Sequence, residues 1–467
     1  MPGASVSKRL AAELPDAAPR ARAALLEVLS DRNARDQLES VFIATADGDE
    51  AVRVAAVNAV GALAHEQAAP RLLLLLDDAK SQRERSAIEK AVAAVCNRAT
   101  NLARRAAPVL DALDPNETQA YCSRLRVLGR IGGDDALSAI RTATVDPRDD
   151  VSKAAYRALA EWPQSGAASA VLDIASKAEK LNHHVLAMRA FARLVGIEKK
   201  QPSKIKLNLY LSGMDAARRV DEQKLLLSRI GELKTKEALR ALDPYLDQGG
   251  LSFEAGAAMI TAADGLLPAG WSQARSVIKK VLATSPPDGV RSRAEALAKR
   301  VAEFEGFITD WLTAGPYSTP GKKGNEILNT VFAPEQPDAA DVKWQKQPLT
   351  KDSPRFWFID MTRLFNGPNR VGYLRARIYS SRPQSARLEL GSDDGLKVWL
   401  NGENIHTNNA LRGCERAQDI VKITLKKGVN ELLLKVSNNG GGWAACARLR
   451  APDGGRLDGV YVKADRK

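Results

Sequence analysis

The sequence has few of the residues on which metal centres and hydrolytic triads depend. Only 4 of its 467 residues are histidine and 4 are cysteine, and aromatic residues make up 5%. So few histidines leave little room for a His-based metal centre or a catalytic triad, and four cysteines exclude a disulfide-rich scaffold. The motifs Gly-x-Ser-x-Gly, His-Glu-x-x-His, Gly-x-x-x-x-Gly-Lys and Cys-x-x-Cys are also absent. We therefore predict a non-enzymatic protein without a resident metal, although a glycosidase that pairs distant carboxylates would leave no local motif.

Long hydrophobic runs are missing as well. The five leucines Leu72–Leu76 fall far short of the roughly 18–20 apolar residues that span a bilayer, so no membrane span is expected. The N-terminal stretch MPGASVSKRLAAELPDAAPR has no apolar core of a secretory signal. The literal expectation is a cytoplasmic protein, whereas an upstream signal that has been removed would make it periplasmic or secreted.

The scarce aromatic residues are concentrated in one part of the chain. Residues 306–467 hold 14 of the 24 Trp, Tyr and Phe residues, including five of the seven tryptophans. The net charge of +13 divides into +8 for this part and +5 for residues 1–305, with the two signs interspersed. Charges that alternate in sign are typical of solvated surfaces rather than of a nucleic-acid face, so nucleic-acid binding is the weakest of the functions considered.

Residues 1–305 show an internal repeat. Apolar residues at helical spacing, as in EAVRVAAVNAVGALA, recur in segments that begin near residues 51, 82, 117, 149, 181, 219, 251 and 288, about 34 residues apart. Shorter helical stretches such as KEALRALDPYLD lie between them. Because neither helix of such a pair can bury its apolar face alone, the pairs must stack. The pattern predicts an α-solenoid of about eight helix pairs, in which alanine lets neighbouring helices approach closely.

These repeats resemble the HEAT family. DGDEAVRVAAVNAVGAL at residues 47–63 is similar to the signature in which an Asp and a Val-Arg pair precede spaced Ala and Leu, and DPRDDVSKAAYRALAEW and PDGVRSRAEALAKRV repeat it. The sequence departs from the pattern at Ser152, which replaces the Arg, and in LNHHVLAMRAFARLVG. The resemblance implies a scaffold for protein–protein interaction.

After FEGFITDWLTAGPYSTPGKKGN, which ends at residue 325, the apolar period changes from 3.6 to 2. VGYLRARIYS places Leu374, Ala376 and Ile378 on one face of a strand, and ARLELGS, LKVWLNG, DIVKITL, NELLLKVSN and WAACARLR follow with turn residues between them. Short alternating strands of this kind predict an antiparallel β-sandwich, jelly-roll-like in form. Asn401-Gly402 is a strong hairpin signal because both turn residues need positive φ. We expect residues 306–345 to be a linker that packs between the domains and residues 346–467 to form the sandwich.

SDDGLKVWLNGENIH and TLKKGVNELLLKVSN resemble galactose-binding-like β-sandwiches, and the Ser392–Gly395 turn is similar to that of protective-antigen-type sandwiches. The whole arrangement resembles uncharacterised HEAT-plus-sandwich proteins of planctomycete-type bacteria, which often accompany secreted polysaccharide-handling enzymes. The resemblance implies carbohydrate binding by the sandwich. In some glycan-binding members two adjacent Asp at this turn hold Ca²⁺, which makes Asp393 and Asp394 the leading ligand-binding candidates. The alternative is a turn in which the Asp side chains cap backbone N–H groups.

Four further residues are candidates for the same site. Trp443 follows Asn439 and three glycines, so an exposed indole could stack on a sugar ring, or it could close the edge of the sandwich. His406 and Arg412 fall in a polar loop after the hairpin, where ligands are often held, although a solvated loop explains them equally well.

The cysteines and the paired histidines have simpler interpretations. Cys414 and Cys446 could pair or remain a loop thiol and a buried one, whereas Cys96 and Cys122 are expected in helices as small core residues. His183 and His184 point about 100° apart on a helix, which favours surface or packing roles over a metal site.

Three functions follow from these observations. The first is a binding protein whose solenoid holds a protein partner and whose sandwich holds carbohydrate or another polymer. The second is a purely structural scaffold in which the sandwich caps or dimerises the solenoid. The third is nucleic-acid binding.

Overall fold

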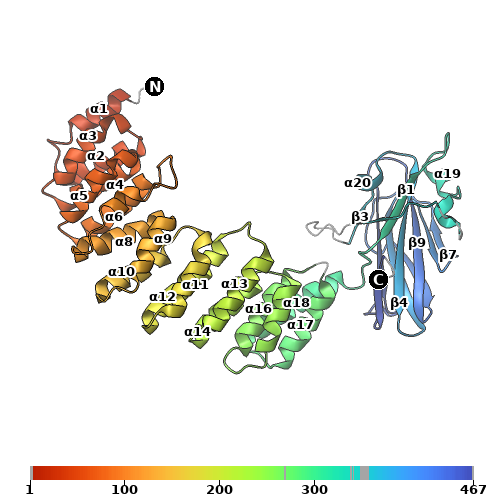
Figure 1. The fold of residues 1–467 in the computed structure, drawn as a ribbon. Helices are drawn as coiled ribbons and strands as arrows, with labels where there is room; N and C mark the ends of the chain where they lie inside the picture. The colour runs from red at the N-terminus through yellow and green to blue at the C-terminus, as the bar shows by residue number, and fades with distance from the viewer. Residues whose placement is uncertain (1–3, 268–269, 337–338, 340, 348–356, 465–467) are drawn as a thin grey trace. The chain divides into compact units, whose positions relative to one another are not determined.

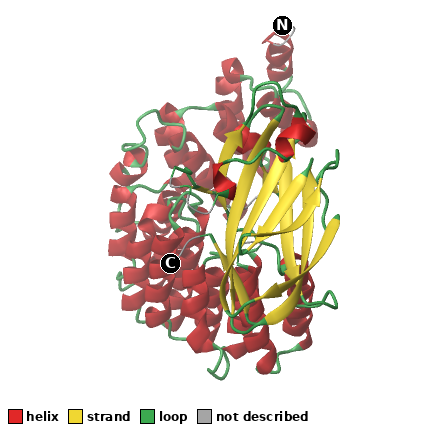
Figure 2. Cartoon of the chain, turned by 90° about the vertical axis from the view of Figure 1, so that its right-hand side faces the viewer, coloured by secondary structure: helices red, strands yellow, loops and turns green. Residues whose placement is uncertain are grey.

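The computed structural model describes residues 4–267, 270–336, 339, 341–347 and 357–464 (Figure 1). Contacts divide the chain into two units, one made of residues 1–233 and 247–258 and the other of residues 234–246 and 259–467. The first unit is helical, and the second contains the last helices and all the strands, which Figure 2 draws in yellow. The predicted fold class, a helical domain followed by an antiparallel β-sandwich, is confirmed.

The helical part consists of α1 (Ala4–Ala12), α2 (Pro19–Asp31) and then pairs made of a first and a second helix. The second helices begin within one residue of the predicted positions. They are α4 (Glu50–Leu63), α6 (Gln82–Cys96), α8 (Thr118–Ile131), α10 (Asp149–Ala160), α12 (Leu181–Ile197), α14 (Val220–Gly231), α16 (Ser252–Asp264) and α18 (Asp288–Phe304). Their partners are α3 (Leu38–Ile43), α5 (Ala69–Asp77), α7 (Ala107–Asp111), α9 (Asp134–Ala143), α11 (Ala168–Lys177), α13 (Ser203–Ala216), α15 (Lys236–Leu242) and α17 (Trp271–Ala283).

Small residues set the distance between the second helices of consecutive pairs. Gly129 on α8 lies against Ala158 on α10, where an added Cβ would come within 2.6 Å of the Ala158 carbonyl oxygen. Gly231 on α14 stands in the same relation to Ala258 on α16, also at 2.6 Å. Because only glycine leaves room for this approach, the Gly–Ala contacts fix how one pair stacks on the next.

Polar contacts also join the second helices of consecutive pairs. Arg53 on α4 forms two hydrogen bonds with Glu84 on α6, at 3.1 and 3.2 Å, and donates to the carbonyl oxygens of Asp47 and Gly48 in the turn before its own helix. Both side chains of this ion pair are buried. One arginine therefore orders the turn of its own repeat and binds the next.

The two adjacent histidines on α12 have different partners. The His183 ring stacks on Tyr156 at a centroid distance of 4.4 Å. The His184 ring is fully buried, with Nδ1 2.9 Å from the Ala175 carbonyl oxygen and Nε2 3.0 Å from a Glu222 oxygen. Both rings thus pack within the array, and they point to separate neighbours.

The strands form two antiparallel sheets. The larger has the order β2-β1-β4-β9-β6-β7, with β11 also paired to β4, and the smaller has the order β3-β10-β5-β8. The strands are β1 (Leu312–Tyr317), β2 (Gln345–Lys346), β3 (Ile359–Asp360), β4 (Arg370–Ser380), β5 (Gln384–Asp393), β6 (Leu396–Leu400), β7 (Glu403–Asn408), β8 (Asp419–Leu425), β9 (Gly428–Asn438), β10 (Ala444–Arg450) and β11 (Val460–Lys463). Two short helices, α19 (Gly324–Leu328) and α20 (Thr362–Phe365), lie between the strands in sequence.

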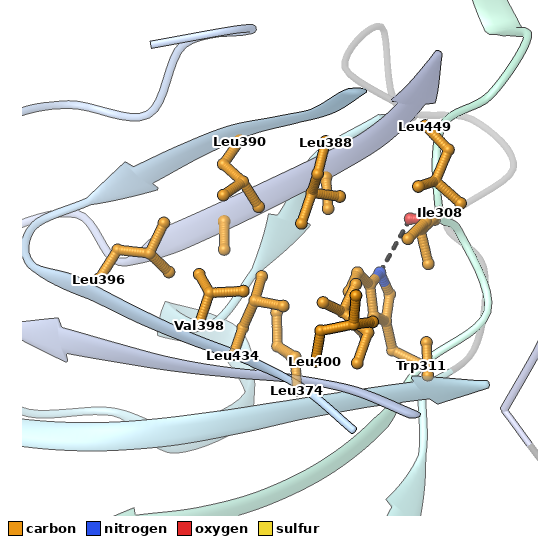
Figure 3. Close-up of a cluster of buried hydrophobic side chains, with 14 of the residues drawn as sticks. Ile308, Trp311, Leu374, Leu388, Leu390, Leu396, Val398, Leu400, Leu434 and Leu449 are labelled. Carbon is orange, nitrogen blue, oxygen red and sulfur yellow. Dashed lines mark hydrogen bonds between the residues drawn. The ribbon is translucent and has the colours of Figure 1, made fainter. Parts of the chain in front are cut away.

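Alternating residues of both sheets meet in one core (Figure 3). Leu374 of β4 and Leu434 of β9 face Leu388 and Leu390 of β5 across it. The hairpin between β6 and β7 turns at Asn401-Gly402, with the predicted positive φ at both residues (55° and 87°). The period-2 pattern therefore identified the buried face of the strands correctly.

The segment expected to be a linker belongs to the sandwich instead. Strand β1 pairs with β4 in the larger sheet, and the fully buried Trp311 indole lies in the core, where its Nε1–H donates to the Ile308 carbonyl oxygen at 2.8 Å (Figure 3). A six-residue strand that contains Gly315-Pro316 gives little alternation for sequence reasoning to detect. Among the residues that the structure describes, no helix combines the length and apolarity of a membrane span.

Candidate ligand-binding site

A cavity of about 920 Å³ opens at the end of β5, between the loop after β7, the turn before β10 and the segment 358–363. It is lined by Phe358, Asp360, Thr362, Arg363, Asp393, Arg412, Gly413, Cys414, Glu415, Gln418, Gly442 and Trp443. Three of the six candidate residues, Asp393, Arg412 and Trp443, therefore meet at one cavity. Asp394 and Asn439 adjoin it, because both contact the same loops.

The Asp394 carboxylate is buried and acts as a brace between these loops. Its Oδ1 accepts the backbone N–H of Arg412 at 3.2 Å, and its Oδ2 accepts that of Asn439 at 2.7 Å. The backbone N–H of Asp394 donates in turn to the Ser437 carbonyl oxygen at 3.0 Å. This is the capping role that the turn hypothesis predicts for an Asp side chain.

Asp393 is different, although it is the adjacent residue. Among the described residues its carboxylate has no hydrogen-bond or ion-pair partner, and its Oδ2 lies where a Cβ on Gly442 would approach to 2.6 Å. Burial, and then the negative charge of Asp394, raise the pKa of Asp393 above its ordinary value. The peptide bond between the two aspartates is cis. The site thus presents one braced carboxylate and one whose oxygens are available to a ligand.

Arg412 is held by a second carboxylate that sequence reasoning missed. Its Nη2 donates to Ser392 Oγ at 2.9 Å and forms an ion pair with Asp419. Burial opposes ionisation of Asp419, but the hydrogen bonds from Arg412 and Asn408 hold its pKa below the ordinary value. Asp419 begins β8 and has no distinctive local motif, so only the folded chain shows that it positions Arg412.

His406 is not in the cavity. It lies on β7, where its Nε2 is 3.5 Å from an Asp419 oxygen, and it does not contribute to the cavity wall. Its relation to the site is therefore indirect, through the carboxylate that it shares with Arg412.

The position of Trp443 contradicts the hypothesis that its indole is exposed for stacking on a sugar ring. Its side chain is only 1% exposed and belongs to the sandwich core, where its ring lies 5.5 Å from that of Phe365. An indole enclosed in this way offers no free face for stacking on a sugar ring. The backbone N–H of Trp443 instead donates to Thr362 Oγ1 at 2.9 Å, which joins β10 to the short helix α20 at the cavity rim.

The donor set limits how a cation could bind. Groups of three or more His, Cys, Asp and Glu that could hold a metal are absent from the described part of the chain. Asp393 could supply a carboxylate to Ca²⁺, whereas both oxygens of Asp394 already accept N–H groups. An ion here would need most of its six to eight oxygen ligands from backbone carbonyls, water or the bound ligand.

A second hollow, of about 330 Å³, lies on the outer face of the larger sheet. Its wall includes two partly exposed tryptophans, Trp344 and Trp399, and the Arg375 guanidinium lies 4.1 Å from the centre of the Trp344 ring. Trp399 lies near the C-terminal end of β6, whereas Asp394 lies in the turn before this strand begins.

Comparisons with known proteins identify only distant similarity. No family model matches the chain, and a search of curated proteins finds no match. The chain is similar to the PA14 domain of the antifreeze protein MpAFP, at 15% identity over 34% of this chain and 75% of that chain, with a TM-score of 0.19. It is also similar to a structure from the computational design of self-assembling cyclic protein homooligomers, at 16% identity over 60% of this chain and 97% of that chain, with a TM-score of 0.12. The function must therefore be argued from the residues of this chain.

Proposed function

We propose that the sandwich binds carbohydrate in the cavity beside Asp393. The observation that carries the proposal is the Asp393 carboxylate, which is partly buried, unpaired among the described residues and directed at a cavity of about 920 Å³. The carboxylate is only partly buried, so its oxygens remain open to the cavity. A ligand that enters the cavity can donate hydrogen bonds to them.

The remaining wall suits a ligand with many hydroxyl groups. Arg363 and Arg412 supply N–H donors, while Thr362, Gln418 and Asp360 supply further donors and acceptors. A saccharide offers several hydroxyls that both donate and accept, and it carries no charge that would oppose the mixture of cationic and anionic groups. Phe358 adds apolar surface at the edge.

Calcium could take part in the same site, as the resemblance to protective-antigen-type sandwiches implies. The Asp393 oxygens are the protein atoms best placed to contact the ion. When bound, the ion would supply positive charge between adjacent carboxylates and hold sugar hydroxyls as ligands. The orientation of the ligand would still depend on Arg412, which Ser392 and Asp419 hold in place.

For the helical part, we propose a HEAT-type scaffold for a protein partner. Arg53 supports this proposal, because it is the Arg of the Val-Arg pair that resembles the HEAT signature. Its side chain forms hydrogen bonds both with the turn before its own helix and with Glu84 of the next repeat. Inter-repeat bonds of this kind leave the solvent-facing residues of each pair available for a partner.

The test is a glycan-array screen of the full chain, performed once with millimolar Ca²⁺ and once with EDTA. We expect a defined set of glycans to be retained by the wild-type chain and lost by Asp393→Asn. Retention in EDTA would show that the carboxylate binds hydroxyls without the ion. If the wild-type chain retains no glycan in either buffer, the carbohydrate proposal is wrong, and the structural role of the sandwich becomes the better explanation.

A further inference from the structure

Two cysteines lie together behind the cavity wall. Cys414 belongs to the loop between β7 and β8, Cys446 lies on β10, and with Ala444 they form a small buried cluster. Their exposed fractions are 8% and 1%, and both are free thiols. The Cys446 side chain contacts that of Cys414, and its Sγ lies 3.6 Å from the carbonyl oxygen of Glu415, the next residue of the loop.

The backbone holds the loop in this position. A Cβ added to Gly391 on β5 would lie 1.8 Å from the Glu415 carbonyl oxygen and 2.9 Å from Cys446 Sγ. The loop therefore lies against β5 at Gly391 and beside Cys446 of β10. The brace from Asp394 to the Arg412 N–H fixes the same loop two residues earlier.

We propose that Cys414 and Cys446 are a disulfide-forming pair, which a low-molecular-weight disulfide such as oxidised glutathione converts to a covalent link between the loop and β10. The Cys414 thiolate attacks one sulfur of the small disulfide and releases one equivalent of the free thiol. The Cys446 thiolate then attacks Cys414 Sγ and releases the second equivalent. Two protein thiols are oxidised, one small disulfide is reduced to two thiols, and the two protons leave with the products.

The order of the steps follows from access. Cys414 lines the cavity, so a small disulfide can reach it, whereas Cys446 is enclosed. Contact with Cys414 and then burial raise the pKa of the Cys446 thiol well above its ordinary value. Because the thiolate is the reactive species, the second attack should limit the rate and should accelerate as pH rises from 7 to 9.

The disulfide would fix the position of one wall of the cavity. The loop that it fastens also carries Arg412 and Gly413, which line the cavity wall. Fixing this wall in its binding geometry reduces the entropy lost when a ligand binds. This consequence rests on the proposed function, whereas formation of the disulfide does not.

The experiment incubates the full chain with oxidised glutathione at pH 8.5, alkylates remaining thiols in denaturant and digests with trypsin. We expect residues 413–416 and 436–448 to appear as one cross-linked peptide pair, while Cys96 and Cys122 are recovered alkylated. Cys446→Ser should instead trap a glutathione adduct on Cys414, and Cys122→Ala should leave the cross-link unchanged. Recovery of Cys414 and Cys446 as separate peptides, alkylated or glutathionylated, would overturn the proposal.

A second arm measures glycan affinity and thermal unfolding of the oxidised and reduced chains. We expect oxidation to raise the unfolding midpoint of the sandwich by about 5 °C, because closing a loop of this length restricts the unfolded state, and to tighten glycan binding severalfold. A cross-link without any glycan binding would contradict the proposed function and leave the disulfide assignment intact. An unchanged midpoint with the cross-link present would show that the link does not stabilise the loop and would overturn that part of the proposal.

Discussion

The Asp394 carboxylate accepts the backbone N–H of Asn439 at a distance of 2.7 Å and so ties the glycine-rich turn before β10 to the end of β5. Its other oxygen accepts the N–H of Arg412 from a loop 18 residues away. One buried side chain thus holds two walls of the proposed ligand site. The adjacent Asp393 carboxylate forms no such hydrogen bond within the described residues, so substitutions at the two positions can be compared directly.

The first prediction separates these two roles. Asp394→Ala leaves two partly buried N–H groups without their acceptor, so it should lower the free energy of unfolding of the sandwich by about 1–3 kcal/mol. Asp393→Ala removes no hydrogen bond within the described residues and should not lower the free energy of unfolding. Urea unfolding monitored by tryptophan fluorescence measures both. Equal losses in the two variants would contradict the assignment of Asp394 as the brace.

The second prediction concerns pH. Burial and the charge of Asp394 raise the pKa of Asp393 above its ordinary value of 3.8. The folded chain therefore holds this proton more tightly than the unfolded chain does. Its contribution to stability is present below pH 3.8 and is lost as the pH rises through the folded-state pKa.

Asp393→Asn, which cannot ionise, should consequently be more stable than the wild-type chain at pH 7 and should match it near pH 3. Unfolding midpoints measured across this range provide the check. A variant that is less stable than the wild type at pH 7 would show that the ionised carboxylate has a stabilising partner.

The third prediction tests repeat stacking at α8. In an open helix Gly→Ala is favourable by up to about 1 kcal/mol, but at Gly129 the new methyl group would overlap the backbone of Ala158. Overpacking against backbone costs about 1–3 kcal/mol or more, so Gly129→Ala should destabilise the helical array. Gly166→Ala, where no atom lies within 4 Å, is the matched control and should not. Differential scanning calorimetry of the full chain distinguishes the two outcomes.

The fourth prediction concerns the buried pair of Arg53 and Glu84. Removing one partner leaves a buried charge, so Glu84→Ala should cost about 3–5 kcal/mol. The exposed pair of Arg71 and Glu39 is the comparison, and Glu39→Ala should leave the unfolding midpoint unchanged within error. If the two substitutions have the same effect, the inter-repeat bond of Arg53 does not stabilise the stack.

The sequence was most informative where local patterns determine structure. The second helices of the pairs begin within one residue of the predicted positions because their apolar spacing marks them, and an Asp, Ser or Pro directly precedes three of them, α4, α6 and α18. Asp49, for example, caps α4 by accepting the N–H groups of Ala51 and Val52. The Asn401-Gly402 hairpin was predictable for the same reason, since its positive φ angles depend on two adjacent residues.

The candidate site was predictable only in part. Local sequence placed Asp393 and Asp394 in a turn, but their different roles depend on N–H groups that come from two distant loops. Trp443 follows three glycines and looks exposed in sequence, yet the core of the sandwich encloses it. Asp419 was missed because only tertiary packing brings it to Arg412.

The most direct test of the account is calorimetric titration of the full chain with the glycan that the array identifies. The prediction is that Asp393→Asn weakens binding at least tenfold, whereas Trp399→Ala, in the outer-face hollow, leaves the dissociation constant within twofold of the wild type. Loss of binding in Trp399→Ala together with unchanged binding in Asp393→Asn would contradict the proposal and place the ligand in the hollow on the outer face of the larger sheet.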